Sequence, residues 1–178
     1  RKELDNPEMV GRHLARIDGT ARELTRAMDE TVWAVNPQHD TLDSLAVYTV
    51  RFAQDFLGPA AIRCRVDMPL TLPAWPIGAE LRHNLFLAYK EAINNVVRHA
   101  NAREVKISLH PREDGFDLWV EDDGQGFDPS RVQSAGSGAP PGRPAGGNGL
   151  RNMRTRMNEI GGTIEIRSHV GGGTTVCL

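Results

Sequence analysis

Hydrophobic side chains in the first part of the chain recur at spacings of three or four residues. This spacing follows the seam of a coiled coil or helical bundle more closely than the broad apolar face of a globular helix. Asn6-Pro7 has the residue types of a helix start, and Asn36-Pro37 those of a helix end. The pattern predicts one long helix over 7–35 that needs a partner helix; the alternative is a surface helix packed on the neighbouring domain. The seam comprises Val10, Leu14, Ile17, Ala21, Leu24, Met28, Val32 and Val35.

Beyond residue 40 the pattern changes between helical and strand periodicity, and both kinds of element are expected. The pattern predicts helices over 41–57, about 78–100 and 150–160. Alternating apolar residues predict strands at 62–66, 105–109 and 116–120, a turn at Asp114-Gly115, and a closing hairpin over 164–178. Together they predict an α+β fold, a two-layer α/β sandwich with a mostly antiparallel sheet and helices on one face.

The segment 129–147 has a different composition from the rest of the chain. It contains four prolines, five glycines and almost no large apolar side chain. Such a segment buries too little surface to order itself, so we expect a mobile loop. The sequence thus predicts a helical region with its connector over 1–38 and a globular domain over 39–178.

Composition and charge narrow the possible functions. The 178 residues carry a formal charge of −2, which gives no electrostatic footprint for nucleic acid. Cys64 and Cys177 lack metal-ligand spacing, and their apolar surroundings predict small core residues in a reducing compartment. No apolar run approaches the length of a membrane span. We expect a soluble, cytoplasmic fragment that makes no membrane contact, on the cytoplasmic side of a membrane where the parent protein is anchored in one.

Candidate chemistry begins on the third expected helix, where four polar residues fall in one narrow stripe bordered by apolar positions. These are Asn84, Glu91, Asn95 and Arg98. Carboxylate and amide oxygens one turn apart suit Mg²⁺, which keeps several waters and bridges to phosphates. The alternative is an exposed stripe with a weak attraction between Glu91 and Arg98.

Asp122 is the second candidate. Strand alternation places it on the buried side of its strand, where an ionised carboxylate needs a hydrogen-bond donor. The exocyclic amine of an amino-purine is such a donor. Gly124 and Gly126 follow at positions where a ligand could approach the backbone, although an ordinary Asp-Gly turn is the alternative.

Two further motifs suit a polyphosphate and the floor of a polar pocket. Gly146-Gly147-Asn148-Gly149-Leu150 leads into a helix, and glycines at a helix start form an anion site, although a flexible linker has the same composition. Near the end of the chain, strand alternation points Thr174 inward, where its hydroxyl could complete a pocket floor.

The order of these motifs resembles that of the catalytic domain of sensor histidine kinases in two-component systems. The stretch 91–100 resembles the N box of that family, 122–127 its first glycine box, and 147–153 its second, while Gly173-Thr174 fits the closing motif. The resemblance implies the Bergerat ATPase fold shared with DNA gyrase, MutL and heat-shock chaperones, and it implies ATP and Mg²⁺ as cofactors.

Carried over position by position, the resemblance implies a role for each matching residue. Asn95 would bind Mg²⁺, Glu91 would be catalytic and would reach the metal through water, and Arg98 would contact phosphate. Asp122 would bind the adenine amine, and 129–147 would form an ATP lid. The remaining nucleotide-binding positions would be Gly124, Gly126, Gly147, Gly149, Leu150 and Thr174.

The connector, with Trp33-Ala34-Val35-Asn36-Pro37, resembles that of kinases that pair with LuxR-type response regulators. By the same resemblance, 7–35 is the second helix of a dimerisation hairpin, and the acceptor histidine lies on the first. His13 is followed by Leu14 rather than an acidic residue, so it does not fit the acceptor pattern. We expect a histidine kinase domain that forms a homodimer in the full-length protein; the alternatives are another ATPase of this fold and a non-catalytic nucleotide-binding or dimerisation module.

Overall fold

The computed structural model of the chain describes residues 7–130 and 148–178. The chain divides into two compact units, one ending at His39 and the other spanning Asp40–Leu178. The expected lid, 129–147, lies outside the described residues except for Pro129 and Ser130, and Gly147 lies outside them entirely.

The first unit is built on one long helix, α1, which spans Pro7–Val35 and confirms the predicted helix. At its end the backbone N–H of Gln38 donates to Asn36 Oδ1 at 3.0 Å, and a short 3-10 turn, η1, follows at Pro37–His39. Five side chains of the apolar seam, Leu14, Ile17, Leu24, Met28 and Val32, are 61–68% exposed. An apolar row of this length gains its stability by packing on another apolar surface.

The second unit contains a five-stranded sheet in the order β1-β2-β3-β5-β4. Three of the four strand pairings are antiparallel, as predicted for a mostly antiparallel sheet, and two of these, β2–β3 and β4–β5, are hairpins. β1 pairs with β2 in parallel because a helix crosses over between them. The strands are β1 Arg63–Asp67, β2 Glu104–Arg112, β3 Gly115–Asp122, β4 Glu165–Ser168 and β5 Thr174–Cys177. The predicted turn position is wrong by one residue: Gly115 pairs with Arg112, so the turn is Glu113-Asp114.

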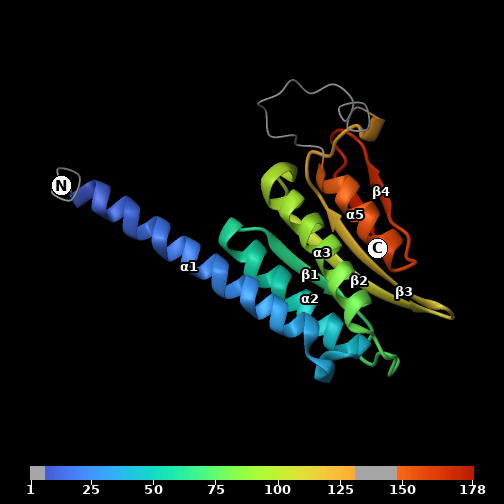
Figure 1. The fold of residues 1–178 in the computed structure, drawn as a ribbon. Coiled ribbons are helices and arrows are strands. Elements are labelled where there is room, and N and C mark those ends of the chain that lie inside the picture. Colours follow the sequence, from blue (N-terminus) through green and yellow to red (C-terminus); the bar gives the residue numbers. More distant parts are fainter. Residues whose placement is uncertain (1–6, 131–147) are drawn as a thin grey trace. The chain divides into compact units, whose positions relative to one another are not determined.

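Three helices of the second unit pack together: α2 (Leu42–Leu57), α3 (Ala79–Asn95) and α5 (Asn148–Glu159). A short 3-10 helix, η2 (Gly58–Ala60), follows α2, and a π-helical turn, η3 (Val96–Ala100), extends α3. Figure 1 shows α3 and α5 side by side in front of the sheet. Thr41 begins α2 by accepting a hydrogen bond from Ser44 N at 3.2 Å, which satisfies an N–H of the first turn.

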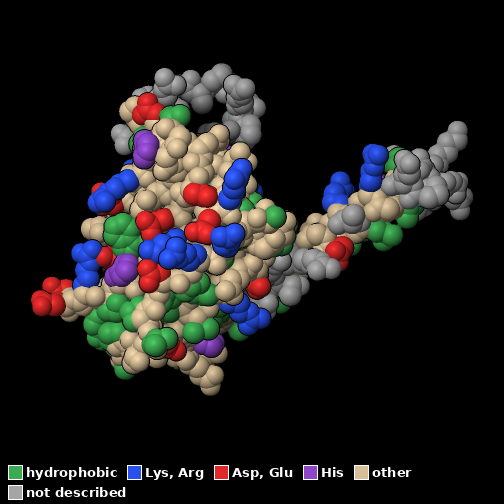
Figure 2. All heavy atoms as spheres, turned by 180° about the vertical axis from the view of Figure 1, so that it is seen from behind, with side chains coloured by type: hydrophobic (Ala, Val, Ile, Leu, Met, Phe, Trp, Pro, Cys, Tyr) green, Lys and Arg blue, Asp and Glu red, His purple; other side chains and the backbone are tan. Residues whose placement is uncertain are grey.

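The core lies between these helices and one face of the sheet. Val105, Ile107 and Leu109 of β2, Leu118 of β3 and Ile93 of α3 are all fully buried. The alternate residues of the strands form the other face, where Lys106 pairs with Asp67 at 2.9 Å. Figure 2, seen from behind, shows basic and acidic side chains interspersed over part of the second unit. The strand pattern therefore sets a two-layer sandwich with one charged face.

The start of the second unit is tied to the beginning of α3. Asp40 forms an ion pair with Arg82, whose side chain is fully buried. The backbone N–H of Ile77 donates to the Asp40 carbonyl at 3.0 Å, and that of Leu42 donates to the Trp75 carbonyl at 3.1 Å. These contacts hold the segment before α2 against the segment that leads into α3 and against the first turn of α3.

The two cysteines differ from the expectation of core residues. Cys64 and Cys177 are both half-buried and form no disulfide. Burial raises the pKa of each thiol. Cys177 pairs with Trp119 on the sheet face that carries the charged side chains, which is why its surroundings are only partly apolar.

Candidate functional site

A cavity of about 420 Å³ lies between the end of α3, the end of β3, the first turn of α5 and β5. Its size is within the range of small-molecule sites in proteins. Eight of the ten predicted site residues, catalytic and nucleotide-binding together, line it: Glu91, Asn95, Arg98, Asp122, Gly126, Gly149, Leu150 and Thr174. Residues from both ends of the chain's second unit therefore converge on one site.

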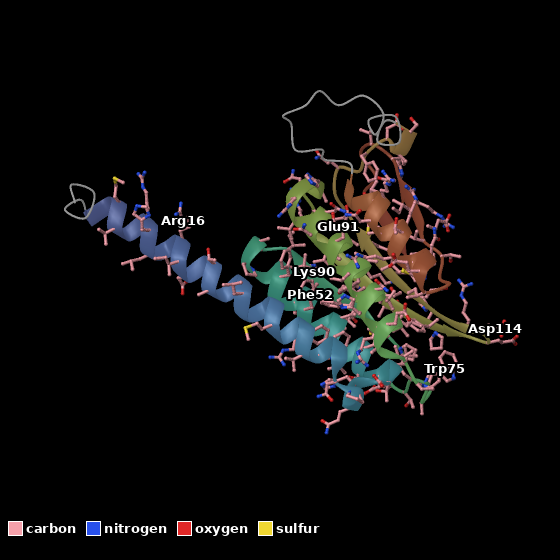
Figure 3. All side chains as sticks on the ribbon, viewed as in Figure 1. Arg16, Phe52, Trp75, Lys90, Glu91 and Asp114 are labelled. Atoms are coloured by element: carbon pink, nitrogen blue, oxygen red, sulfur yellow. The ribbon has the colours of Figure 1, made fainter. Side chains whose placement is uncertain are left out.

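The helical wall comes from the last turns of α3 and from the π turn. Glu91, Asn95 and Arg98 face the cavity at spacings of four and three. The side chain of Glu91, labelled in Figure 3, lies with its Oε1 against Gly149 in the first turn of α5. The positive end of the α5 dipole therefore faces this carboxylate.

Asn84, the first residue of the expected polar stripe, does not line the cavity. It is 8% exposed, and its Oδ1 accepts a hydrogen bond from Arg156 Nη1 at 3.2 Å. No local pattern along the chain indicates this contact, because Arg156 is 72 residues away from Asn84. Asn84 thus belongs to the packing of α3 against α5.

Asp122 ends β3 with its side chain on the cavity side, as its strand position predicts. Its Oδ1 accepts a hydrogen bond from the backbone N–H of Gly124 at 2.9 Å. Burial raises the pKa of the Asp122 carboxyl above its ordinary value, while hydrogen bonds from Gly124 and Thr174 act in the opposite direction. Thr174 is its partner in the β3–β5 register, so the two polar groups stand side by side.

The neighbouring carboxylate, Asp123, points away from this site. Its Oδ1 accepts from the backbone N–H groups of Arg103 and Glu104, at 2.8 and 2.9 Å. The bonds from Glu104 and Arg103 lower the pKa of Asp123. Of the two adjacent aspartates, one faces the cavity and the other fixes the loop before β2.

The glycines of the first box are required by close contacts within the protein. Gly124 does not line the cavity; a Cβ there would collide with the Ala100 carbonyl oxygen. Gly126 has a φ of 59°, and a Cβ there would collide with the carbonyl of His169 and lie 2.7 Å from that of Gly173. Both glycines are therefore required by the approach of the chain to itself, and Gly126, which also lines the cavity, stays a predicted nucleotide-binding position.

Several cavity residues were missed by sequence reasoning. Asn94 and His99 belong to the N-box stretch, and their proximity to Asn95 and Arg98 was a signal that could have found them. Gln125 and Phe127 lie inside the first glycine box. Met153 lies inside the second glycine box, and three apolar lining residues carried no motif signal: Val120, Ile166 and Val176.

Comparison with known proteins places this chain in a family. Residues 81–178 match the family described as histidine kinase-, DNA gyrase B-, and HSP90-like ATPase, and the chain belongs to this family. The predicted resemblance to a kinase-type ATPase domain is confirmed. The family is one of ATPases, so an ATP-binding fold is present.

Curated relatives are sensor proteins. The chain is 30% identical over 115 residues to the nitrate/nitrite sensor protein NarQ of Escherichia coli, which is 64% of this chain and 18% of the relative. It is 36% identical over 97 residues to the signal transduction histidine-protein kinase/phosphatase UhpB of Salmonella typhimurium. This match covers 54% of this chain and 17% of the relative. It is 31% identical over 111 residues to the sensor histidine kinase LiaS of Bacillus subtilis, and this match covers 62% of this chain and 28% of the relative. The matches thus span less than a third of each relative's length.

Solved structures show the same fold at low sequence identity. The histidine kinase AdeS of Acinetobacter baumannii has a TM-score of 0.59 at 17% identity, covering 97% of this chain and 84% of that one. The blue-light activated histidine kinase of Erythrobacter litoralis EL346 has a TM-score of 0.60 at 21% identity, covering 96% and 58%. The predicted α+β sandwich is therefore confirmed.

Across the part of the chain that the structure describes, helices are too short or too polar to cross a membrane.

Proposed function

We propose that the second unit is the catalytic domain of a two-component sensor histidine kinase, and that it binds the Mg²⁺ complex of ATP in the cavity described above. The observation that carries this proposal is the convergence of Glu91 and Asn95 from α3 with Asp122 from β3 and Gly149 from α5 around one cavity. These residue types come from all three boxes of the family, and family membership supports their use.

The base of the nucleotide is assigned to the Asp122 end. An ionised, half-buried carboxylate beside a threonine hydroxyl offers acceptors for the exocyclic amine of adenine. Apolar lining from Val120, Met153 and Ile166 would cover the faces of the purine ring.

The phosphates are assigned to the end formed by Arg98 and the first turn of α5. Backbone N–H groups at a helix start and the guanidinium of Arg98 both attract polyphosphate. Gly149 and Leu150, in that first turn, are within the cavity wall. The triphosphate would then extend from Asp122 along α3.

The residues present suit Mg²⁺ in the manner expected for a nucleotide complex. Among residues 7–130 and 148–178 no group of three or more His, Cys, Asp or Glu side chains could hold a metal ion. Mg²⁺ commonly binds through one or two protein oxygens together with substrate phosphates, and the Asn95 side-chain oxygen is suited to this, with Glu91 acting through water. When bound, the ion would neutralise charge on the phosphate oxygens.

In the proposed reaction a histidine nitrogen attacks the γ-phosphorus, the bond to the β–γ bridging oxygen breaks, and ADP leaves with that electron pair. The protein's task is positioning and charge stabilisation, because phosphoryl transfer asks little covalent chemistry of its side chains. Arg98 would hold phosphate charge, and Asp122 would fix the base. Glu91 would orient the attacking group, and its carboxylate would accept a proton from it.

The first unit and the partners are assigned by the same resemblance. The exposed seam of α1 would pair with the other helix of a dimerisation hairpin and with a second copy of the chain, over a region that ends near residue 38. A histidine on the paired helix, rather than the exposed His13, would accept the phosphoryl group. A response regulator, of the LuxR type by the resemblance of the connector, would receive it. The chain would act on the cytoplasmic side of a membrane where the parent is anchored in one.

Transfer to an acceptor helix tests this function. The chain is incubated with γ-labelled ATP, Mg²⁺ and a separately made helical hairpin that carries a His-Asp or His-Glu pair. We expect label on the hairpin that is stable to base and lost in acid, as phosphohistidine is. The same hairpin with its histidine replaced by alanine is the control. Tight nucleotide binding without any label would instead favour a non-catalytic nucleotide-binding module.

A further inference from the structure

Ser168, the last residue of β4, joins three segments at the rim of the cavity but is not itself among the residues that line it. Its Oγ accepts a hydrogen bond from the backbone N–H of Phe127 at 2.9 Å. It lies 2.9 Å from the Gly173 carbonyl oxygen and 3.0 Å from Thr174 Oγ1. Phe127 and Thr174 both line the cavity, so one hydroxyl touches two parts of its wall.

The hydrogen-bonding capacity of a serine accounts for all three contacts. A hydroxyl has one proton and two acceptor lone pairs. The Gly173 carbonyl can only accept and the Phe127 N–H can only donate, so they occupy the Ser168 proton and one of its lone pairs, and Thr174 Oγ1 lies 3.0 Å from the same oxygen. Thr174 is the register partner of Asp122, so Ser168 holds the Thr174 side chain beside that carboxylate.

The backbone around Ser168 is closely packed, so the surrounding segments cannot shift to compensate for a lost Ser168 contact. Gly126 lies under the carbonyls of His169 and Gly173 with no room for a Cβ. The backbone N–H of Gly171 donates to the Gln125 carbonyl at 2.7 Å, and the Gln125 N–H donates to the Ala100 carbonyl at the same distance. The β4–β5 turn, the loop after Asp122 and the end of η3 are therefore connected by backbone hydrogen bonds.

We propose that Ser168 is a positioning residue that sets the selectivity of the site for the purine base. It acts through Thr174 and through the backbone at Phe127, and it does not touch the nucleotide. This inference rests on the proposed function, because it assumes that the base lies at the Asp122 end. The ligand feature that it governs is the exocyclic amine, the group that distinguishes adenine from a purine with a carbonyl at that position.

The test compares binding of ATP and of inosine triphosphate, which carries a carbonyl in place of the amine, to the whole chain. Loss of one well-placed hydrogen bond typically weakens binding about fivefold to tenfold. We expect Ser168→Ala to weaken ATP binding by about that factor, with a much smaller effect on inosine triphosphate, so that the preference for ATP falls. Dissociation constants come from titration calorimetry, and melting curves without nucleotide check the fold.

Two further variants separate positioning from loss of structure. Ser168→Thr keeps the hydroxyl and should retain the wild-type preference. Ser108→Ala is the matched control: the Ser108 hydroxyl lies in the same sheet, is buried, and has no hydrogen-bond partner within the described residues. Its removal should leave both dissociation constants unchanged.

The outcomes distinguish failure of the proposed role of Ser168 from failure of the proposed function. Equal weakening of both nucleotides by Ser168→Ala, or an unchanged preference, overturns the role of Ser168 while the proposed function stands. If Ser168→Ala fails to fold, Ser168→Cys replaces it, since a thiol of similar size hydrogen-bonds more weakly and should give a reduced preference. A wild-type chain that binds neither nucleotide contradicts the proposed function, and the inference fails with it.

Discussion

At the scale of single residues, two adjacent aspartates show how one step along a strand separates two roles. Asp122 faces the cavity, and its pKa is raised by burial. Asp123 faces the other way, and hydrogen bonds from the loop before β2 lower its pKa. The physical reason is that Asp122 is the last residue of β3 and Asp123 follows it in extended backbone, where successive side chains point to opposite sides.

Asp122→Ala is expected to abolish ATP binding and to leave the fold intact, because the acceptor for the adenine amine is lost while the surrounding core is unchanged. Titration calorimetry measures binding and a thermal melt measures stability. The matched control is Asp123→Ala, which should lower the free energy of unfolding by about 1 kcal/mol through its lost hydrogen bonds and leave ATP affinity unaltered. ATP affinity that survives in Asp122→Ala would refute the assignment of the base.

The raised pKa of Asp122 predicts a pH dependence of binding. The ionised carboxylate accepts from the amine, so ATP affinity should fall as pH drops through the raised pKa, which lies above the ordinary value for aspartate. Stability responds in the opposite sense: since the folded pKa is raised, the contribution of this group to the free energy of unfolding is present at pH below the unfolded pKa and is lost as pH rises through the folded pKa.

The measurement is a series of ATP dissociation constants over about pH 4 to 7, a range that covers an aspartate with a raised pKa. Asp122→Asn carries no titrating group at this position and should show a weaker and flatter profile. Parallel profiles for the two proteins would mean that another group controls binding in this range.

At the scale of elements, the site depends on how closely the β4–β5 turn approaches the loop after β3. Gly126→Ala should destabilise the second unit by about 1–3 kcal/mol, because its φ is 59° and a Cβ would meet the His169 and Gly173 carbonyls. Chemical denaturation of the whole chain measures the free energy of unfolding.

Gly58→Ala is the matched control for this prediction. Gly58 has a helical φ of −55° and an added Cβ would meet nothing within 4 Å. Alanine there should be neutral or stabilising by up to about 1 kcal/mol. Similar effects of the two substitutions would contradict the close packing at Gly126.

How far each element could be predicted follows from the range of the interactions that define it. The helices α1, α2 and α5 and the hairpins were predictable because caps, prolines and hydrophobic periods are local signals. Asn84 was misplaced because its partner, Arg156, lies on another helix. The role of Gly124 was misread because its neighbour, Ala100, belongs to η3, the π turn that extends α3.

At the scale of the whole molecule, α1 predicts self-association. Its seam residues Ile17 and Leu24 are 64% and 61% exposed. Replacing both by aspartate should shift the chain toward the monomer. Burying these charges in an apolar helix–helix contact would cost free energy and would weaken the association of the two copies. Light scattering coupled to size-exclusion chromatography measures the mass as a function of concentration.

Thr20→Asp is the control for this prediction, since Thr20 is exposed on α1 and lies off the seam. It adds the same kind of charge and should leave the mass unchanged. ATP affinity should be the same in all of these variants, because the cavity is lined by residues of the second unit alone. A wild-type chain that is monomeric at every concentration would contradict self-association through α1 alone.

The sequence by itself determined the kinds of element, the face of each strand and the residue types of the site, because these follow from nearest neighbours along the chain. It also determined the family, since the motifs keep their order. The tertiary structure decided that Gly124 packs against Ala100, that Asn84 joins α3 to α5, and that Ser168 binds the backbone at Phe127. Those contacts join residues far apart in sequence, and only the packing of helices on the sheet fixes such distances.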